Sequence, residues 1–240
     1  MVAFLFVLVI VALVGLALLL ATQRSEQQAL TFAEPVRRAE VRLPAGAVDF
    51  AVTDGPVRVQ RSARWVLVKP ATSERVDDGV LRVEVRSQRS WLGGEVTYRV
   101  EVPAAADVQA STGAGAVSVH GTTGEVDVRT AAGTVTLANL SGRVRATTQA
   151  GQVRGTGLGP GEVDASSSAG TVSLAFDAPP DRVEARTNAG SVELLVPDQR
   201  YAVDASSYAG TARVEVEHDP DAPRRLVAHS NAGAVRVGRR

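Results

Sequence analysis

The fold of this chain is decided by residues 112–137, which read TGAGAVSVHGTTGEVDVRTAAGTVTL. A phrase made of a hydroxyl residue, any residue and then Ala-Gly occurs twice here, at residues 112–115 and 130–133. Apolar residues alternate after each copy, and a weaker phrase, Gly124-Glu-Val-Asp-Val, lies midway between the copies. Alternation with period two indicates short strands with one buried face. Each repeat therefore predicts two short strands that meet at an Ala-Gly corner.

The same phrase occurs seven times, and its glycines are 18, 18, 19, 20, 20 and 23 residues apart. A short strand cannot bury its apolar face alone, but stacked copies bury a continuous column of Val, Ala and Leu. We therefore predict a mainly β protein, a β-solenoid with coils of 18–20 residues, over a β-sandwich, whose strands differ from one another. The predicted corners form a structural turn ladder, with glycine suited to positive φ and each hydroxyl bonded within its corner or to the next coil. Its members are Thr112, Thr130, Thr148, Ser167, Thr187, Ser207 and Ser230, with Gly115, Gly133, Gly151, Gly170, Gly190, Gly210 and Gly233.

The chain begins with an apolar segment, because residues 2–21 contain no charged or hydrogen-bonding side chain. Twenty helical residues span about 30 Å, the hydrocarbon thickness of a bilayer. We predict a transmembrane anchor at residues 1–22 and a tether at 23–38, with a cleavable signal peptide or a buried helix as alternatives. Arg24, Arg37 and Arg38 favour a cytoplasmic domain, but long domains cross membranes whatever their flanking charge. We expect a single-pass protein of the cell membrane with an extracytoplasmic domain.

Residues 39–105 show the alternation without the strict phrase, and residues 106–240 carry the regular repeats. Candidate strands in the first part lie at 39–43, 47–52, 56–61, 80–86 and 96–102. We interpret this part as irregular first coils and a cap. Gly46 and Gly55 lie near the positions where repeat glycines would fall.

Composition excludes several classes of function. The chain has no cysteine, which excludes disulfides, zinc fingers, iron–sulfur sites and a cysteine nucleophile. Lys+Arg and Asp+Glu are equal at 26 each, so no net field attracts nucleic acid. The sequence holds no GxSxG, HExxH or phosphate-loop motif. We therefore predict no enzyme activity, no catalytic residues, no metal and no cofactor; the enzyme alternative requires a deep cleft near His218.

Insertions that grow at one corner of the later coils predict a binding ridge. Loops on one side of a solenoid are a common place for binding, although Pro- and Asp-rich turns are also ordinary turn chemistry. The ridge residues are Asp177, Asp181, Asp198, His218, Asp219 and Asp221. A second predicted feature is an outward column that ends in three stacked carboxylates, those of Asp164, Glu184 and Asp204, as a weak cation site or a solvated charge ladder.

The order of these features resembles a bacterial domain family of unknown function that is labelled "putative adhesin". The resemblance lies in the apolar start, the variable first section, a strand ending in Val102-Pro103 and the serial phrases, and it covers residues 39–240. It implies a β-helix-like solenoid associated with the cell envelope, and it brings no catalytic residues. Many relatives have a basic N-terminal region, which this chain lacks.

These observations together predict a non-enzymatic, membrane-anchored envelope scaffold or adhesin-like module. Its rigid surface would bind an unknown protein or glycan partner. The alternative is a sensory or regulatory partner in an envelope-stress system, which could face the cytoplasm. We expect a monomer, because the last coil would present an open edge that the terminal Arg239 and Arg240 protect from pairing.

Overall fold

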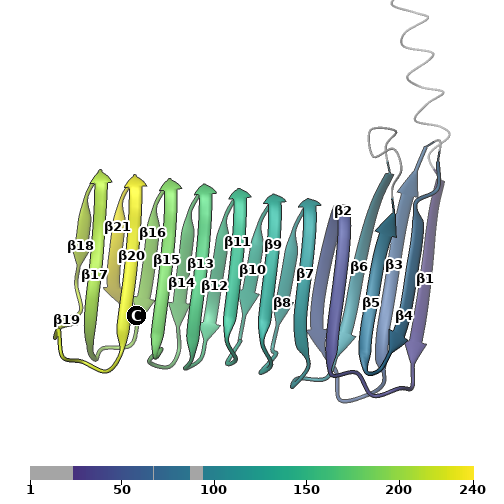
Figure 1. The fold of residues 1–240 in the computed structure, drawn as a ribbon, viewed down its shortest axis with the longest axis horizontal. Helices are drawn as coiled ribbons and strands as arrows, with labels where there is room; N and C mark the ends of the chain where they lie inside the picture. Colours follow the sequence, from purple (N-terminus) through teal and green to yellow (C-terminus); the bar gives the residue numbers. More distant parts are fainter. Residues whose placement is uncertain (1–23, 67, 87–93) are drawn as a thin grey trace, which may run out of the picture.

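The computed structural model describes residues 24–66, 68–86 and 94–240, which form 21 β-strands and no helix. The repeats stack as rungs, each consisting of one strand, an Ala-Gly corner and a second strand that runs back (Figure 1). The first strands of all rungs form sheet 1, and the second strands form sheet 2. The prediction of a mainly β, solenoid-like fold is confirmed.

Sheet 1 contains, in spatial order, β4 (Ala71–Asp77), β5 (Val80–Arg86), the first part of β2 (Arg38–Val52), β7 (Asp107–Ala114), β9 (Val126–Ala132), β11 (Val144–Ala150), β13 (Glu162–Ala169), β15 (Arg182–Ala189), β20 (Arg225–Ala232) and β17 (Arg200–Ala209). Sheet 2 contains β1 (Arg24–Phe32), β3 (Val57–Trp65), β6 (Gly94–Val102), the second part of β2, β8 (Val117–His120), β10 (Val135–Ala138), β12 (Val153–Leu158), β14 (Val172–Phe176), β16 (Val192–Val196), β21 (Val235–Arg239) and β18 (Ala212–Val214). The two-residue β19 (Glu217–His218) lies beside the start of β17. With eleven strands at a spacing of about 4.8 Å, the rod is about 50 Å long.

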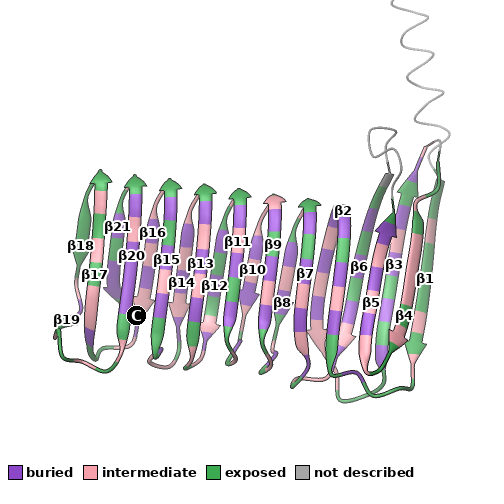
Figure 2. Cartoon of the chain, viewed as in Figure 1, coloured by how far each residue is buried: buried purple, intermediate pink, exposed green. Residues whose placement is uncertain are grey.

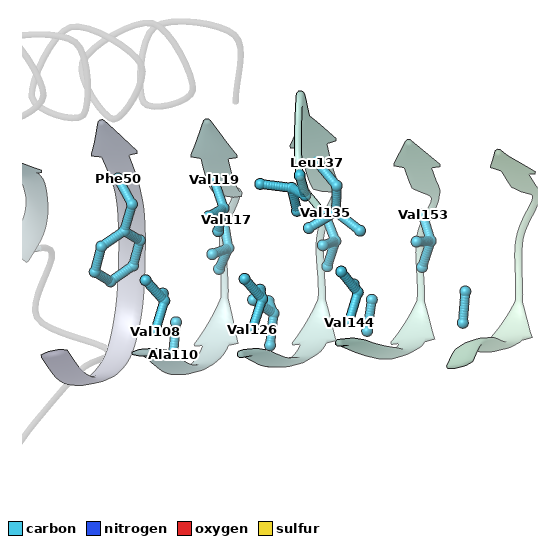
Figure 3. Packing of buried hydrophobic residues seen from close by; sticks show 14 of the residues in the cluster. Phe50, Val108, Ala110, Val117, Val119, Val126, Val135, Leu137, Val144 and Val153 are labelled. Carbon is cyan, nitrogen blue, oxygen red and sulfur yellow. The ribbon is translucent and has the colours of Figure 1, made fainter. Parts of the chain in front are cut away.

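Identical phases of the repeat pair across neighbouring rungs, so the buried residues form continuous columns. Val126 pairs with Val144, which pairs with Val163, and on sheet 2 Val117 pairs with Val135. These side chains are buried between the sheets, where small aliphatic groups fill the axis (Figures 2 and 3). The alternation in the sequence therefore becomes one apolar core along the rod.

The corner of each rung depends on glycine for two reasons. The φ angle of Gly151 is 146°, a region that residues with a Cβ rarely adopt. A Cβ at this position would also overlap the carbonyl oxygen of Gly133 in the preceding rung. The same overlap recurs from Gly115 to Gly233, so the rungs stack more closely at the corner than a side chain would permit.

The last two rungs are not stacked in sequence order. The C-terminal rung, β20–β21, lies between β15–β16 and β17–β18 and pairs with both in the common register. The expectation that the C-terminal coil presents the open edge is therefore wrong. The β17–β18 rung is at the end of the rod (Figure 1). The C-terminal rung can lie inside the stack because the rungs on both sides of it pair with it in the same register.

The first rung is also internal, and this part of the structure corrects the predicted tether. β2 bends at Gly46 and lies between the β5–β6 pair and the β7–β8 rung. Beyond β6, the strands β3 and β1 add to sheet 2 in antiparallel directions, and β4 adds to sheet 1. β1 lies within residues 23–38, which were expected to be a tether. These residues form a strand because all nine residues of β1 pair along the full length of β3.

The predicted anchor at residues 1–22 lies outside the described residues. Within the part of the chain that the structure describes, there is no helix of the length and hydropathy needed to cross a membrane.

Candidate functional site

The predicted hydroxyl column lies inside the molecule, where it joins successive rungs. Hydroxyl groups donate hydrogen bonds to the glycine carbonyl of the neighbouring rung, at 2.9 Å from Thr187 to Gly170 and at 2.7 Å from Ser207 to Gly233. Thr112 instead donates to the carbonyl of Ala114. The other four hydroxyl groups follow the first pattern and donate to the glycine carbonyl of the neighbouring rung: Thr130 to Gly115, Thr148 to Gly133, Ser167 to Gly151 and Ser230 to Gly190. All of these hydroxyl residues except Ser207 are buried, so the column acts in rung-to-rung bonding.

The structure does not bring the predicted ridge residues together into one site. The carboxylate of Asp177 contacts Arg240, and that of Asp198 lies 3.3 Å from Arg239. The Asp181 carbonyl accepts a hydrogen bond from the amide of Arg225, between two rungs. No group of three or more His, Asp or Glu side chains that could hold a metal ion occurs among the described residues.

His218, Asp219 and Asp221 lie on the segment that returns from β18 to β20. The Nδ1 atom of His218 accepts a hydrogen bond from the amide of Val203 at 3.1 Å, which leaves the proton of the neutral ring on Nε2. The Asp219 carboxylate accepts from the amide of Asp221 at 3.0 Å. This segment therefore forms a lip beside the start of β17.

The lip borders an open hollow of about 380 Å³. Its walls combine small and proline side chains with three polar groups, and its lining residues are Ala202, Val203, Asp204, His218, Pro220, Ala222, Pro223 and Arg225. The carboxylate of Asp204 also lies 3.1 Å from Nε2 of His229 on the adjacent strand. Of the predicted ridge, only His218 contributes to this hollow.

The carboxylate column ends differently from the prediction. Because β20 is inserted, Val227 lies between Glu184 and Asp204 and separates the last two carboxylates. The predicted stack of three acids is therefore wrong. The prediction fails because it assumed that the rungs stack in sequence order, which the phase of the repeat does not determine.

The rung at this end of the rod exposes apolar groups. Tyr208 is 94% exposed and Val214 is 41% exposed, and these are two of the three large hydrophobic residues that are exposed in the described ranges. Val203 and Ala205 of β17 are only partly covered, although their counterparts in other rungs are buried. The apolar column therefore reaches the surface at this end.

The opposite end of the column closes on a cluster of charged and polar side chains. Arg61, which is only 8% exposed, donates to Glu74 at 2.9 Å and to Glu26 at 3.1 Å. Tyr98 donates to the same Glu74 carboxylate at 2.7 Å. We call Arg61, Glu74, Glu26 and Tyr98 the polar plug. It was not predicted, although one signal was present: in the strand VRVQRSARW, Arg61 occupies an apolar phase.

The charges of the polar plug stabilise one another. A hydrogen bond from Lys69 holds the pKa of Glu26 below its ordinary value, with the charges of Lys69 and Arg61 acting in the same direction. Burial, together with the bond to Glu74, raises the pKa of Tyr98 far above its ordinary value. Burial, the largest single influence, lowers the pKa of Arg61, but the hydrogen bonds and charge contacts with Glu74 and Tyr98 together outweigh it and the pKa is raised. The contacts within the plug therefore favour the charged forms of Glu26 and Arg61.

Comparison with known proteins gives a family and a shared fold. A family described as Toastrack DUF4097 matches residues 39–237. A crystal structure described as a "putative adhesin" from Bacteroides fragilis NCTC 9343 has a TM-score of 0.52 at 12% identity, covering 90% of this chain and 97% of that one. A "putative adhesin" from Parabacteroides distasonis ATCC 8503 has a TM-score of 0.49 at 13% identity, with 90% and 97% coverage. No curated protein matches the chain significantly. The Bacteroides fragilis structure shows that this chain and that protein share the solenoid fold.

Proposed function

The chain belongs to the Toastrack DUF4097 family, and on this premise we propose that it is a non-enzymatic binding module of the bacterial cell envelope. In this proposal, residues 2–21 anchor the protein in the cell membrane and the rod projects outward. The end with the exposed β17–β18 rung binds a protein or glycan partner. The family match supports the proposal because it agrees with the resemblance seen in the sequence.

The difference between the two ends of the rod carries this proposal. The end that bears β1 is closed by the polar plug, and it is also the end nearest to the apolar segment in sequence. The other end, about 50 Å away, exposes Tyr208 and Val214. Contiguous exposed apolar surface with a polar rim is typical of interaction sites. We therefore assign binding to the end that contains Tyr208, which we call the open end.

The shape of the rod suits the presentation of this end. Main-chain ladders join every neighbouring pair of rungs, and charged side chains bridge rungs on the outside, for example Arg143 with Glu162 at 2.6 Å. A solenoid joined in this way holds its two ends at a fixed separation. The name "putative adhesin" of the Bacteroides fragilis protein is consistent with a partner outside the membrane.

Topology is the first test of this function. The chain has no cysteine, so Arg240→Cys gives a single reactive site on an exposed residue. We expect a membrane-impermeant maleimide to label this variant in intact cells. Labelling only after lysis would place the domain in the cytoplasm and would favour the regulatory alternative.

Binding at the open end is the second test. Beads that carry the full-length chain through its N-terminal residues are incubated with intact bacterial cells, and retained cells are counted. We expect Tyr208→Ala to reduce retention several-fold, because aromatic anchors dominate contact energies. Asn188→Ala is the matched control, since Asn188 occupies the same phase on an internal rung. Equal retention by both variants would remove the open end from the proposal.

A further inference from the structure

The outer edge of the β17–β18 rung carries unpaired main-chain groups. In this parallel stack the inward-facing residues bond to the following rung: the amide of Val108 donates to Glu125, and that of Val126 donates to Arg143. The β17–β18 rung has no complete rung after it. The alternation of a parallel ladder therefore directs the amides and carbonyls of Ala205 and Val214 away from the body of the rod.

A further rung is already begun at this edge. β19 pairs in parallel with Arg200 and Tyr201, and the amide of Asp219 donates to the carbonyl of Tyr201 at 3.0 Å. The chain then turns away through Pro220 and Pro223 toward β20. From Val203 to Val214 the position of the next rung is vacant in the described structure, apart from the imidazole of His218 on the amide of Val203.

This edge also lacks the usual protection against pairing. Proteins commonly block an exposed edge with lysine, proline, a bulge or an inward-pointing charge. Between Ala202 and Ala209 the strand contains no lysine and no proline, and its single charged residue, Asp204, points outward. The inward positions Val203 and Ala205 continue the apolar column. The opposite end places Arg61 and Glu26 at inward positions.

We propose that this edge binds an extended segment of another protein, which adds as a strand and completes the rung that β19 begins. This inference rests on the proposed function and specifies how the open end binds. Main-chain hydrogen bonds supply affinity in such strand addition, and alternate side chains supply specificity. The segment adds parallel to β17, in line with β19, with small apolar residues at every second position.

The corner specifies the segment further. Each glycine carbonyl from Gly115 to Gly233 accepts a hydroxyl from the adjoining rung, and each corner leaves no space for a Cβ there. Gly210 is the next corner glycine at the open edge and adjoins Gly233 in the stack, although it does not share the positive φ of the other six. A segment that follows the edge around the corner therefore needs a hydroxyl residue, any residue, Ala and then Gly.

A second copy of this chain fits the edge poorly. Stacking the opposite end on it would place the charged Glu26, paired with Arg61, and the polar Gln28 against the apolar Val214, and burying such polar groups against an apolar surface is unfavourable. Antiparallel pairing of two open edges over residues 203–209 would bring the corner of one copy against β19 of the other. A segment from a different protein meets neither obstacle.

The test uses the full-length chain and a synthetic peptide with the sequence of residues 225–239, which already pairs with the inner edge of β17 and β18. Fluorescence anisotropy of the labelled peptide measures its binding. We expect saturable binding that weakens more than about tenfold in a peptide carrying Gly233→Val, because the valine would meet the Gly210 carbonyl. Absence of binding, or equal binding of both peptides, would overturn the proposal.

Cross-linking locates the bound peptide. A peptide with His229→Cys should form a disulfide, under air oxidation, with the chain variant Ser206→Cys and not with Arg186→Cys. Residue 229 of β20 lies between positions 186 and 206 in the native stack. Cross-linking to both variants would show that the peptide has replaced β20, and would contradict addition at the edge.

Edge variants separate this mode from the proposed function. Val214→Lys places a charge at an exposed inward position and should abolish peptide binding, whereas Ser206→Lys points outward and should not. Thermal unfolding verifies that both variants fold. Self-association of the chain that Val214→Lys removes would identify a second copy as the occupant and overturn the proposal. If the peptide fails to bind while Tyr208→Ala still reduces cell retention, strand addition is wrong and the binding function stands.

Discussion

Substitution of one corner glycine tests the close stacking of the rungs. In Gly151→Ala, the new Cβ would overlap the carbonyl oxygen of Gly133, well inside the 3.0 Å that real Cβ atoms respect. The positive φ of 146° adds a backbone cost of about 1–3 kcal/mol. Relief of the overlap requires the rungs to separate at the corner. The hydrogen bonds from Gly133 to Ala150 and from Gly151 to Ala169, both 2.9 Å, lie at that point.

Loss of two such bonds costs about 2 kcal/mol, so we expect a total destabilisation of about 3–5 kcal/mol. This is a large part of the ~5–15 kcal/mol that stabilises a typical domain. Urea unfolding followed by far-UV circular dichroism measures it. Gly55→Ala is the control, because its Cβ would meet only the Thr53 hydroxyl at 3.5 Å, and it should change stability by less than about 1 kcal/mol. A loss below about 1 kcal/mol in Gly151→Ala would refute the stacking argument.

Three further substitutions, one of them with a control, test other contacts. Thr187→Val removes the buried hydroxyl that donates to Gly170 at 2.9 Å, and it should lower the urea midpoint by an amount equivalent to about 1 kcal/mol; an unchanged midpoint would count against the hydroxyl ladder. Glu74→Leu leaves Arg61 buried without its nearest carboxylate and should cost about 3–5 kcal/mol, whereas Arg75→Ala at an exposed pair should cost at most about 1 kcal/mol in the same assay. The hydrogen bond from Arg236 lowers the pKa of Glu215 below its ordinary value. This pair therefore stabilises the folded state above that ordinary pKa and ceases to do so as the pH falls through the lowered pKa. The unfolding temperature should therefore fall less between pH 7 and about pH 3 in Glu215→Gln than in the unsubstituted chain. Equal falls would show that the pair does not contribute to stability.

The repeat predicted the rung, its corner and its buried face, because these depend on local chemistry. Residues 112–137 already contain the three local features: a hydroxyl residue two positions before each Ala-Gly pair, alternating Val and Ala, and a glycine at the corner, where φ is positive. The register across rungs followed from the same phrase, since residues of equal phase pair throughout the stack.

The polar plug was visible only as an exception. Arg61 interrupts the apolar phase of its strand, but its partners Glu26 and Glu74 lie 35 and 13 residues away. Glu26 belongs to β1, whose polar sequence shows little alternation and pairs with β3 along its whole length. Tertiary contact, and not local propensity, makes this segment a strand.

The amino-acid sequence by itself determined the repeating unit, the identity of the core side chains and the need for glycine at each corner. The tertiary structure alone decided the order of the rungs, which encloses the first and last rungs and leaves β17–β18 at the end of the rod. The physical reason is that every rung presents nearly the same phase to its neighbours, so local pairing energies distinguish poorly between one order and another. The segments that connect the rungs, among them the return through Pro220 and Pro223, select the order and with it the edge that remains exposed.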